Sequence, residues 1–297
     1  MTIHEPGTTT ITAPGVTAVP VVHENHLCVT TRDMALMADD LTAVYLTTAQ
    51  LAALGVPTDG RVLLEVGTTR GTVDRDYALR VDDDAAATIM SRTSATRAVA
   101  PRDLERRAWS RTVNRAVAVL RTTERTRFDP RDGSVLTWND TGSRAVNGAG
   151  ADYFPRINPA VIGLIELAGT DRVLLARDAR RDFFSLVAGY VEPGESLEHA
   201  FAREVAEETG RTCRDIRYAG SQPWPISDSV MIGFTAVTDD ADARWGTDGE
   251  LAEIIWAGPA DILDGVVPIA PPGSIAHRLI LGWARARATA ATTNTEH

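Results

Sequence analysis

Residues 189–210 read GYVEPGESLEHAFAREVAEETG, and their pattern is the most informative in the sequence. Pro193 favours a sharp turn near its start, and Ser196 is a residue type that commonly caps the N-terminus of a helix. The apolar residues that follow recur at helical spacing, and Gly210 is typical of the position just past a helix end. The stretch therefore predicts a loop that leads into a helix over residues 197–209.

Glutamates of this helix fall on the side that its apolar residues occupy. On a helical wheel Glu204 and Glu208 lie in the middle of the apolar arc, and Glu207 lies at its edge. A carboxylate buried without a partner costs several kcal/mol, and like charges this close repel each other. Arg203 can neutralise one carboxylate, and a hard divalent cation such as Mg²⁺ would neutralise the others and bridge them to a phosphate. The alternative is a solvated helix that is simply rich in glutamate.

The whole chain is expected to belong to the α/β (α+β) class, with a polar connector between two domains. We place a smaller N-terminal α+β domain at residues 1–122, the connector at 123–155, the second domain at 156–290 and a disordered tail at 291–297.

Apolar periodicity predicts the elements inside these domains. Alternating or short apolar runs predict strands at residues 44–46, 61–66, 77–81, 160–167, 172–177, 230–238 and 253–256. Helical spacing predicts two further helices, at residues 103–122 and 274–288. Residues 1 to about 25 are expected to form a loose lead that is poor in strands.

Composition limits the classes of function. The net charge of −10 gives no general attraction for nucleic acid or anionic lipid, so a polyanion must be held by a local binding site. Two cysteines exclude a disulfide scaffold and a cysteine-rich zinc site within one chain. The sequence has no apolar run of about 18 residues and no secretory signal pattern, so we expect a cytoplasmic protein without a membrane segment.

The helix and its loop resemble a known motif. The matching residues are Gly189, Glu195, Arg203, Glu204, Val205, Glu207, Glu208 and Gly210. They resemble the Nudix box, G-x5-E-x7-R-E-U-x-E-E-x-G-U, with Arg211 in place of the final apolar residue. The resemblance implies a Nudix α/β/α sandwich and hydrolysis of a nucleoside diphosphate linked to another moiety.

A second string narrows the resemblance to one branch of that superfamily. Residues 221–225 read SQPWP, and with Ser229 they are similar to the S-Q-P-W-P-F-P-x-S array of the NADH pyrophosphatases. An aromatic residue between prolines is expected to form a stiff loop on which a base can stack, and Tyr190 offers a second ring. The alternative for Trp224 is a buried core aromatic.

The resemblance implies a reaction, its cofactors and its residues. We expect hydrolysis of NADH, and of NAD⁺ with lower preference, to the nicotinamide mononucleotide and AMP, and removal of NAD caps from RNA is a second substrate for the same site. Two or three Mg²⁺ or Mn²⁺ ions would be held by Glu204, Glu207, Glu208 and Glu250. The resemblance also implies a homodimer.

Residue roles follow from the same resemblance. Glu208 would orient or deprotonate the attacking water, and Arg203 would hold Glu195 or a carboxylate of the box. The expected substrate contacts are Tyr190, Glu195, Ser221, Gln222, Trp224 and Ser229. The alternative for Glu250 is an exposed loop carboxylate. Rival functions are hydrolysis of ADP-ribose or other nucleotide sugars, and a non-catalytic dinucleotide sensor.

The chain departs from the family pattern in two places. Many relatives carry a four-cysteine zinc ribbon in the connector, whereas Asp129 and Asp132 stand at the first pair of cysteine positions here, so we expect no structural zinc. Residues 226–228 read ISD where the array has F-P-x. We expect this change to loosen the loop and to place the charge of Asp228 near a bound pyrophosphate.

Overall fold

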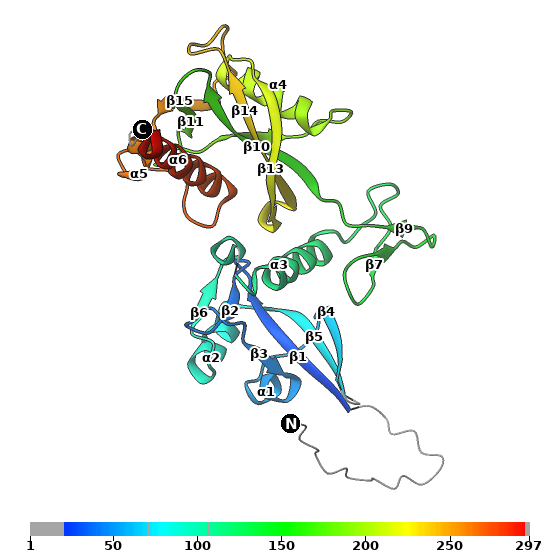
Figure 1. Cartoon of the computed structure of the whole chain (residues 1–297). Coiled ribbons are helices and arrows are strands. Elements are labelled where there is room, and N and C mark those ends of the chain that lie inside the picture. Colours follow the sequence, from blue (N-terminus) through cyan, green and yellow to red (C-terminus); the bar gives the residue numbers. More distant parts are fainter. Residues whose placement is uncertain (1–20, 70–71, 106, 295–297) are drawn as a thin grey trace, which may run out of the picture.

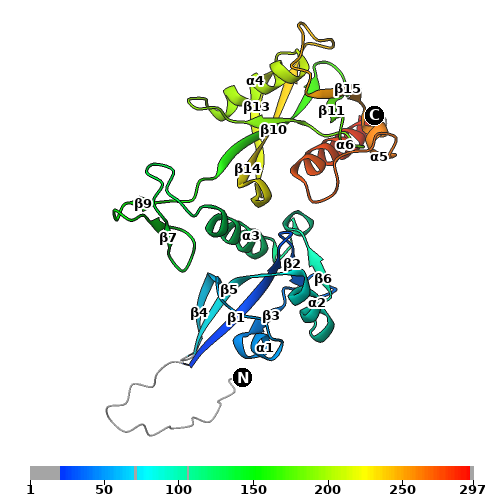
Figure 2. The ribbon, with the colours of Figure 1, turned by 180° about the vertical axis from the view of Figure 1, so that it is seen from behind.

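The computed structural model describes residues 21–69, 72–105 and 107–294, and the expectations for residues 1–20 and 295–297 lie outside this range. The chain forms an N-terminal domain, a small connector and a C-terminal domain (Figure 1). Helix α3 (Ser110–Arg125) lies between the N-terminal sheet and the C-terminal domain, and the view from behind shows the same arrangement (Figure 2). None of the described helices is long and apolar enough to cross a membrane.

The N-terminal domain is built on a six-stranded sheet in the order β4-β5-β1-β2-β6, with β3 paired to β1. Its elements are β1 (Val21–Thr30), β2 (Ala35–Met37), β3 (Tyr45–Thr47), α1 (Thr48–Ala53), β4 (Val62–Thr69), β5 (Thr72–Val81), α2 (Asp83–Arg92) and β6 (Arg97–Val99). Val113, Val117 and Leu120 of α3 pack on one face of the sheet. Leu51 of α1 and Ile89 of α2 pack on the other face, so the sheet is covered on both sides.

Two boundaries in this domain differ from the sequence expectation. The expected loose lead ends earlier, because β1 begins at Val21 and pairs in parallel with β5 along its whole length. The expected helix at 103–122 begins only at Ser110, because Pro101–Leu104 forms a separate 3₁₀ turn, η1, that buries Leu104 in the core.

The connector is a three-stranded antiparallel sheet of β7 (Thr137–Trp138), β8 (Ala145–Val146) and β9 (Asp152–Tyr153). Asp129 stands at its centre and is fully buried. Its carboxylate accepts hydrogen bonds from the backbone amide of Arg131 at 2.9 Å, from the Arg131 guanidinium at 2.6 Å and from Asn147 Nδ2 at 3.0 Å. Asn147 Nδ2 also donates to Asp132 at 3.2 Å, so polar side chains join the two loops of the connector.

The C-terminal domain has helices on both faces of a sheet in the order β13-β14-β10-β11-β15, with β12 paired to β10. Its elements are β10 (Asn158–Leu167), β11 (Val173–Asp178), β12 (Val187–Tyr190), α4 (Leu197–Thr209), β13 (Arg214–Trp224), the 3₁₀ turn η2 (Pro225–Ser227), β14 (Ser229–Thr238), β15 (Leu251–Ala257), α5 (Pro259–Leu263) and α6 (Ile275–Asn294). Phe201 and Val205 of α4 pack on one face, and Ile280 and Ala284 of α6 pack on the other. The expected α/β/α sandwich is confirmed.

The predicted helix 197–209 is confirmed at both ends, but two other expectations are wrong. Ser221 to Trp224 belong to strand β13, where they pair with β14, and do not form a loop. Helix α6 runs to Asn294, so the expected disordered tail is helical over its first residues.

Candidate active site

Helix α4 holds its side chains at fixed positions because both of its ends are capped. The side chain of Ser196 accepts a hydrogen bond from the backbone amide of His199 at 3.2 Å, as expected for an N-cap. Gly210 ends the helix with φ 66°, a left-handed conformation that favours glycine. The acidic residues of this helix therefore lie on a rigid support.

Glu208 is the most deeply buried carboxylate of this helix. It is 6% exposed, and its Oε2 atom has no hydrogen-bond partner among the described residues. Burial, and then the nearby charges of Glu204, Asp248 and Glu250, raise the pKa of Glu208 to about 8. An oxygen that is buried and unpartnered in acidic surroundings is a favourable place for a cation.

Glu204 lies against the backbone of the preceding strand. A Cβ atom built on Gly189 would lie 2.0 Å from the carboxyl carbon of Glu204, so only glycine leaves room for this side chain. Burial raises the pKa of Glu204, although the nearby Arg203 opposes the shift. The glycine at the start of the motif thus forms part of the cradle for a carboxylate.

Arg203 joins the other carboxylates of the motif. Its guanidinium donates to Glu195 at 2.7 Å and to Glu204 and Glu207 at 2.9 Å each, and it also reaches the carbonyl of Tyr190. The hydrogen bond from Arg203 lowers the pKa of Glu195 to about 2. Arg203 therefore ties the loop before the helix to the helix itself, as the motif predicts.

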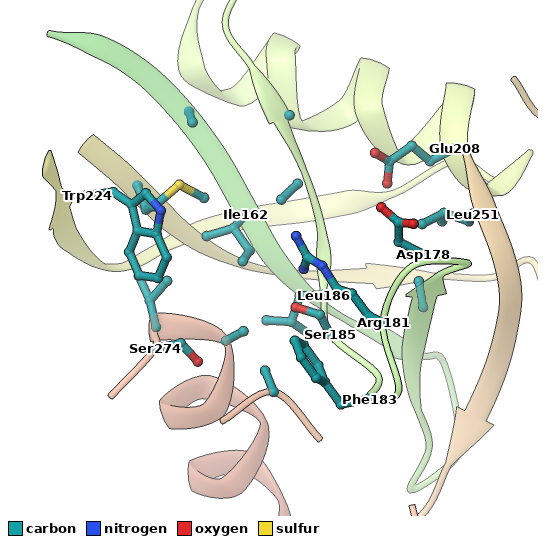
Figure 3. Close-up of a pocket in the computed structure, with 18 of the residues that line it drawn as sticks. Ile162, Asp178, Arg181, Phe183, Ser185, Leu186, Glu208, Trp224, Leu251 and Ser274 are labelled. Carbon is teal, nitrogen blue, oxygen red and sulfur yellow. The ribbon is translucent and has the colours of Figure 1, made fainter. Parts of the chain in front are cut away.

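A cavity of about 550 Å³ lies beside these residues (Figure 3). Trp224 stands at one end, and Glu208 faces Asp178 at the other. Arg181 extends between the two ends, with the ring of Phe183 below it in this view. The cavity thus combines an aromatic wall, an acidic end and a cation in between.

The structure brings some of the predicted site residues to this cavity and leaves others away from it. Glu208, Tyr190, Trp224 and Glu250 line the cavity. Tyr190 is 53% exposed, so its ring is open to solvent, whereas Trp224 is half-buried rather than a core residue. Glu250 is exposed on the loop before β15.

Two of the three polar residues of the second string, Gln222 and Ser229, contact protein groups. Gln222 is buried, and its side chain donates to the carbonyl of Gly273 at 2.7 Å and accepts from the amide of Ile275 at 2.7 Å, which secures the start of α6. Ser229 lies 3.3 Å from the hydroxyl of Tyr190 and holds that ring. Ser221 lines a second cavity of about 340 Å³ between the domains.

Sequence reasoning missed four residues that line the main cavity: Arg102, Asp178, Arg181 and Phe183. Asp178 could have been found, because a polar residue at the end of a buried strand is a common position for functional groups. Arg181 and Phe183 lie in the loop after it, and Arg102 comes from the N-terminal domain, where local pattern carries no signal.

The donor set fits a hard divalent cation, although it is not preassembled. Among residues 21–69, 72–105 and 107–294, no group of three His, Cys, Asp or Glu side chains is placed so as to hold a metal ion. In this structure Glu204 and Glu207 form ion pairs with Arg203 instead. Carboxylate oxygens are the ligands that Mg²⁺ and Mn²⁺ prefer, and Glu208 offers one such oxygen without a partner among the described residues.

Comparisons with known proteins agree with this geometry. Residues 157–275 match the family model described as NUDIX domain. NAD-capped RNA hydrolase NudC from Mycobacterium bovis is 46% identical over 150 residues, which cover 50% of this chain and 48% of that protein. NAD-capped RNA hydrolase NUDT12 from Macaca fascicularis is 33% identical over 194 residues, 58% of this chain and 41% of that protein. The matched part thus spans about half the length of these curated relatives.

A solved structure of a NUDIX hydrolase from Nitrosomonas europaea covers 55% of this chain and 93% of its own, with a TM-score of 0.46 and 22% identity. This likeness is too distant to carry an argument.

Proposed function

We propose that this chain, whose residues 157–275 match the NUDIX domain family model, hydrolyses the pyrophosphate of NADH and NAD⁺. The products would be the nicotinamide mononucleotide and AMP, and the same site would remove an NAD cap from the 5′ end of RNA. The observation that carries the proposal is the unpartnered, buried oxygen of Glu208 at the acidic end of a cavity with an aromatic wall. The names of the curated relatives support the choice of substrate.

The cavity suits a dinucleotide in size and in chemistry. Its volume of about 550 Å³ falls in the range of small-molecule sites. The rings of Trp224 and Tyr190 offer surfaces for a base. Arg181 and Arg102 place positive charge along the wall, which would bind phosphate groups in a cavity that otherwise carries carboxylates.

The residues of the chain divide the work of the proposed reaction. Mg²⁺ or Mn²⁺ ions, held by Glu204, Glu208 and Glu250 with Glu207 at the edge, would neutralise the pyrophosphate and activate a water molecule. Glu208 would orient that water, and its carboxylate would accept the proton. Arg203 keeps the loop and the helix together and positions Glu204.

A cytoplasmic location and a homodimer are also part of the proposal. The resemblance implies two subunits, and the described residues include no helix that could cross a membrane. Light scattering coupled to gel filtration would show a mass of twice 31.9 kDa for a dimer.

The test is a substrate comparison with product identification. The full chain is incubated with Mn²⁺ or Mg²⁺ and with NADH, NAD⁺, ADP-ribose or NAD-capped RNA, and the products are identified by mass spectrometry. We expect AMP and reduced nicotinamide mononucleotide from NADH, and no products after chelation of the metal. Hydrolysis of ADP-ribose alone would replace the proposal with a nucleotide-sugar hydrolase, and tight binding without turnover would indicate a sensor.

A further inference from the structure

A buried arginine lies where the N-terminal domain meets the wall of the cavity. Arg121 is on α3, and only 5% of its side chain is exposed. Its guanidinium donates to the carboxylate of Asp33, in the turn between β1 and β2, and to the backbone carbonyl of Ile226 in the C-terminal domain. Its Nε atom lies 3.7 Å from the carboxylate of Asp228. One side chain of the N-terminal domain thus contacts two positions of the other domain.

Those two positions belong to the turn that continues the aromatic wall. Ile226 lies in η2, between β13 and β14. Trp224, two residues before Ile226, and Ser227, directly after it, line the cavity. Asp228 ends the turn with φ 53°, and its amide donates to the carbonyl of Pro225 at 3.2 Å. The turn is therefore held from outside the cavity by α3 and forms part of the cavity on its inner side.

The structure adds two observations to the expectation for residues 226–228. Asp228 is not among the residues that line the cavity, and its carboxylate is paired with Arg121. The loss of the family's aromatic residue and proline at this turn is accompanied by a charged anchor from another domain. The turn therefore has a contact with α3 that the sequence expectation did not include.

The burial of Arg121 suggests that this residue does more than hold the two domains together. A buried guanidinium is costly unless its hydrogen bonds are satisfied. The Nε atom of Arg121 has no hydrogen-bond partner among the described residues, so part of this cost remains. Asp33 has a second partner in Arg80 at 3.1 Å and does not depend on Arg121 alone. Arg121 is thus poorly suited to be a pure stabiliser of the fold.

Other contacts bring the N-terminal domain to the same cavity. Arg102 of η1 lines it, and Gly273, just before α6, packs so closely on the carbonyl of Arg102 that a Cβ atom there would lie at 2.2 Å. Glu105 accepts a hydrogen bond from Arg278 of α6 at 3.1 Å. The two domains therefore meet along the edge of the cavity.

We propose that Arg121 is a positioning residue for the substrate site: through Ile226 and Asp228 it sets the turn η2 and with it the placement of Trp224. The N-terminal domain is then a working part of the site. The change in KM that we expect from this proposal rests on the proposed dinucleotide hydrolysis. The expected change in the mobility of η2 does not depend on that activity.

The first experiment replaces Arg121 and a matched control on the same helix. Arg115 is an exposed arginine of α3, so Arg115→Met removes the same charge without touching η2. In Arg121→Met we expect KM for NADH to rise about 10-fold while kcat stays within about 3-fold, because the acidic end of the cavity is unchanged. Arg115→Met should leave both constants at the wild-type values. Equal KM in wild type and Arg121→Met would overturn the proposal.

A second variant tests the same contact in case Arg121→Met does not fold. Asp228→Asn changes only the partly exposed partner and should raise KM in the same direction by a smaller factor. Combined with Arg121→Met it should add little, because both changes remove the same contact. Independent, additive effects on KM would argue against a shared role.

A readout that needs no activity separates this proposal from the proposed function. Amide hydrogen exchange over residues 224–229 should become about 10-fold faster in Arg121→Met or Arg121→Lys, while exchange in β11 stays unchanged. If the wild-type chain hydrolyses none of the dinucleotides but this local change occurs, the proposed function fails and the positioning of η2 stands. Unchanged exchange in that segment would overturn the inference whatever the activity.

Discussion

Asp129 of the connector and Glu208 of the C-terminal domain are both buried carboxylates, and they differ in their partners. Asp129 accepts hydrogen bonds from Arg131 and Asn147, and the Arg131 hydrogen bonds hold the pKa of Asp129 well below its usual range. Glu208 keeps an oxygen without a partner, and burial raises its pKa to about 8. The hydrogen bonds of the chain satisfy the first carboxylate, whereas the second keeps one oxygen that no described group contacts.

This contrast separates a structural carboxylate from a functional one. A buried charge that is fully hydrogen-bonded stabilises the local fold, and its loss lowers stability. A buried charge left unpartnered costs stability, and it is tolerated where it binds a ligand or performs chemistry. Substitution at the two positions should therefore have opposite consequences for stability and activity.

The largest expected effect is at Glu208. Glu208→Gln should lower kcat for NADH hydrolysis by at least ~10²-fold, because the amide can neither bind the metal as an anion nor accept a proton. Its thermal unfolding temperature should stay the same or rise, because glutamine has nearly the same shape and removes a buried group whose ionisation the surroundings disfavour. Steady-state kinetics and calorimetry measure the two quantities.

Glu198 on the outer face of the same helix provides the control for that experiment. Its side chain is exposed, so Glu198→Gln should retain wild-type turnover and stability. Near wild-type turnover in Glu208→Gln would remove the catalytic role assigned to Glu208.

The next effect concerns the cradle of Glu204. Gly189→Ala places a methyl group where a Cβ atom would lie 2.0 Å from the Glu204 carboxyl group. The side chain must move, and a displacement of about 1 Å at an active site can cost on the order of 10²-fold in rate. We expect kcat to fall by ~10-fold or more, measured by the same assay.

Gly282 of α6 is a suitable control, since nothing lies within 4 Å of a Cβ atom built there. Gly282→Ala should leave kcat unchanged and stabilise the helix by about 0.5–1 kcal/mol. An active Gly189→Ala enzyme with wild-type metal dependence would show that the position of Glu204 is not critical.

The smallest effect on activity is expected in the connector. Asp129→Asn should leave kcat unchanged and lower the unfolding temperature by a few degrees at neutral pH, because the Arg131 guanidinium loses its charged partner. Asp140→Asn, at an exposed position of the same connector, should change neither quantity. A fall in kcat with no loss of stability would contradict the structural role of Asp129.

The same variant carries a pH dependence. The pKa of Asp129 is lower in the folded chain than the value of about 3.9 expected after unfolding. Its stabilising contribution is therefore fully present above about pH 4 and is lost as the pH falls through the folded value. The difference in unfolding temperature between wild type and Asp129→Asn should disappear in acid, and a difference that grows there would have the wrong sign.

The helix and its acidic face could be predicted from the sequence because they depend on local spacing. Periodicity places Glu204 and Glu208 on the buried side, and Gly210 marks the end of the helix, as the structure confirms. The strand β13 was not predicted, because its proline and glycine obscure the alternation that pairing with β14 imposes.

The residues of the cavity that the sequence did not predict are placed there by long-range contacts. Asp178 and Arg181 reach the cavity only because β11 lies next to β10 in the sheet, and Arg102 reaches it from the other domain. Gln222 lies in a string that suggests substrate binding, yet both polar ends of its side chain bind the backbone at the start of α6. Neither fact is visible in local sequence.

The polar clasp formed by Asp129, Arg131 and Asn147 has a consequence for the conditions in which the connector keeps its shape. Cysteine thiolates that hold zinc are open to oxidation by peroxides and lose their metal when zinc is scarce. Carboxylate, guanidinium and amide groups undergo neither change. A connector closed by these groups should keep its structure under oxidative stress and zinc starvation, conditions in which a thiolate-bound connector would come apart.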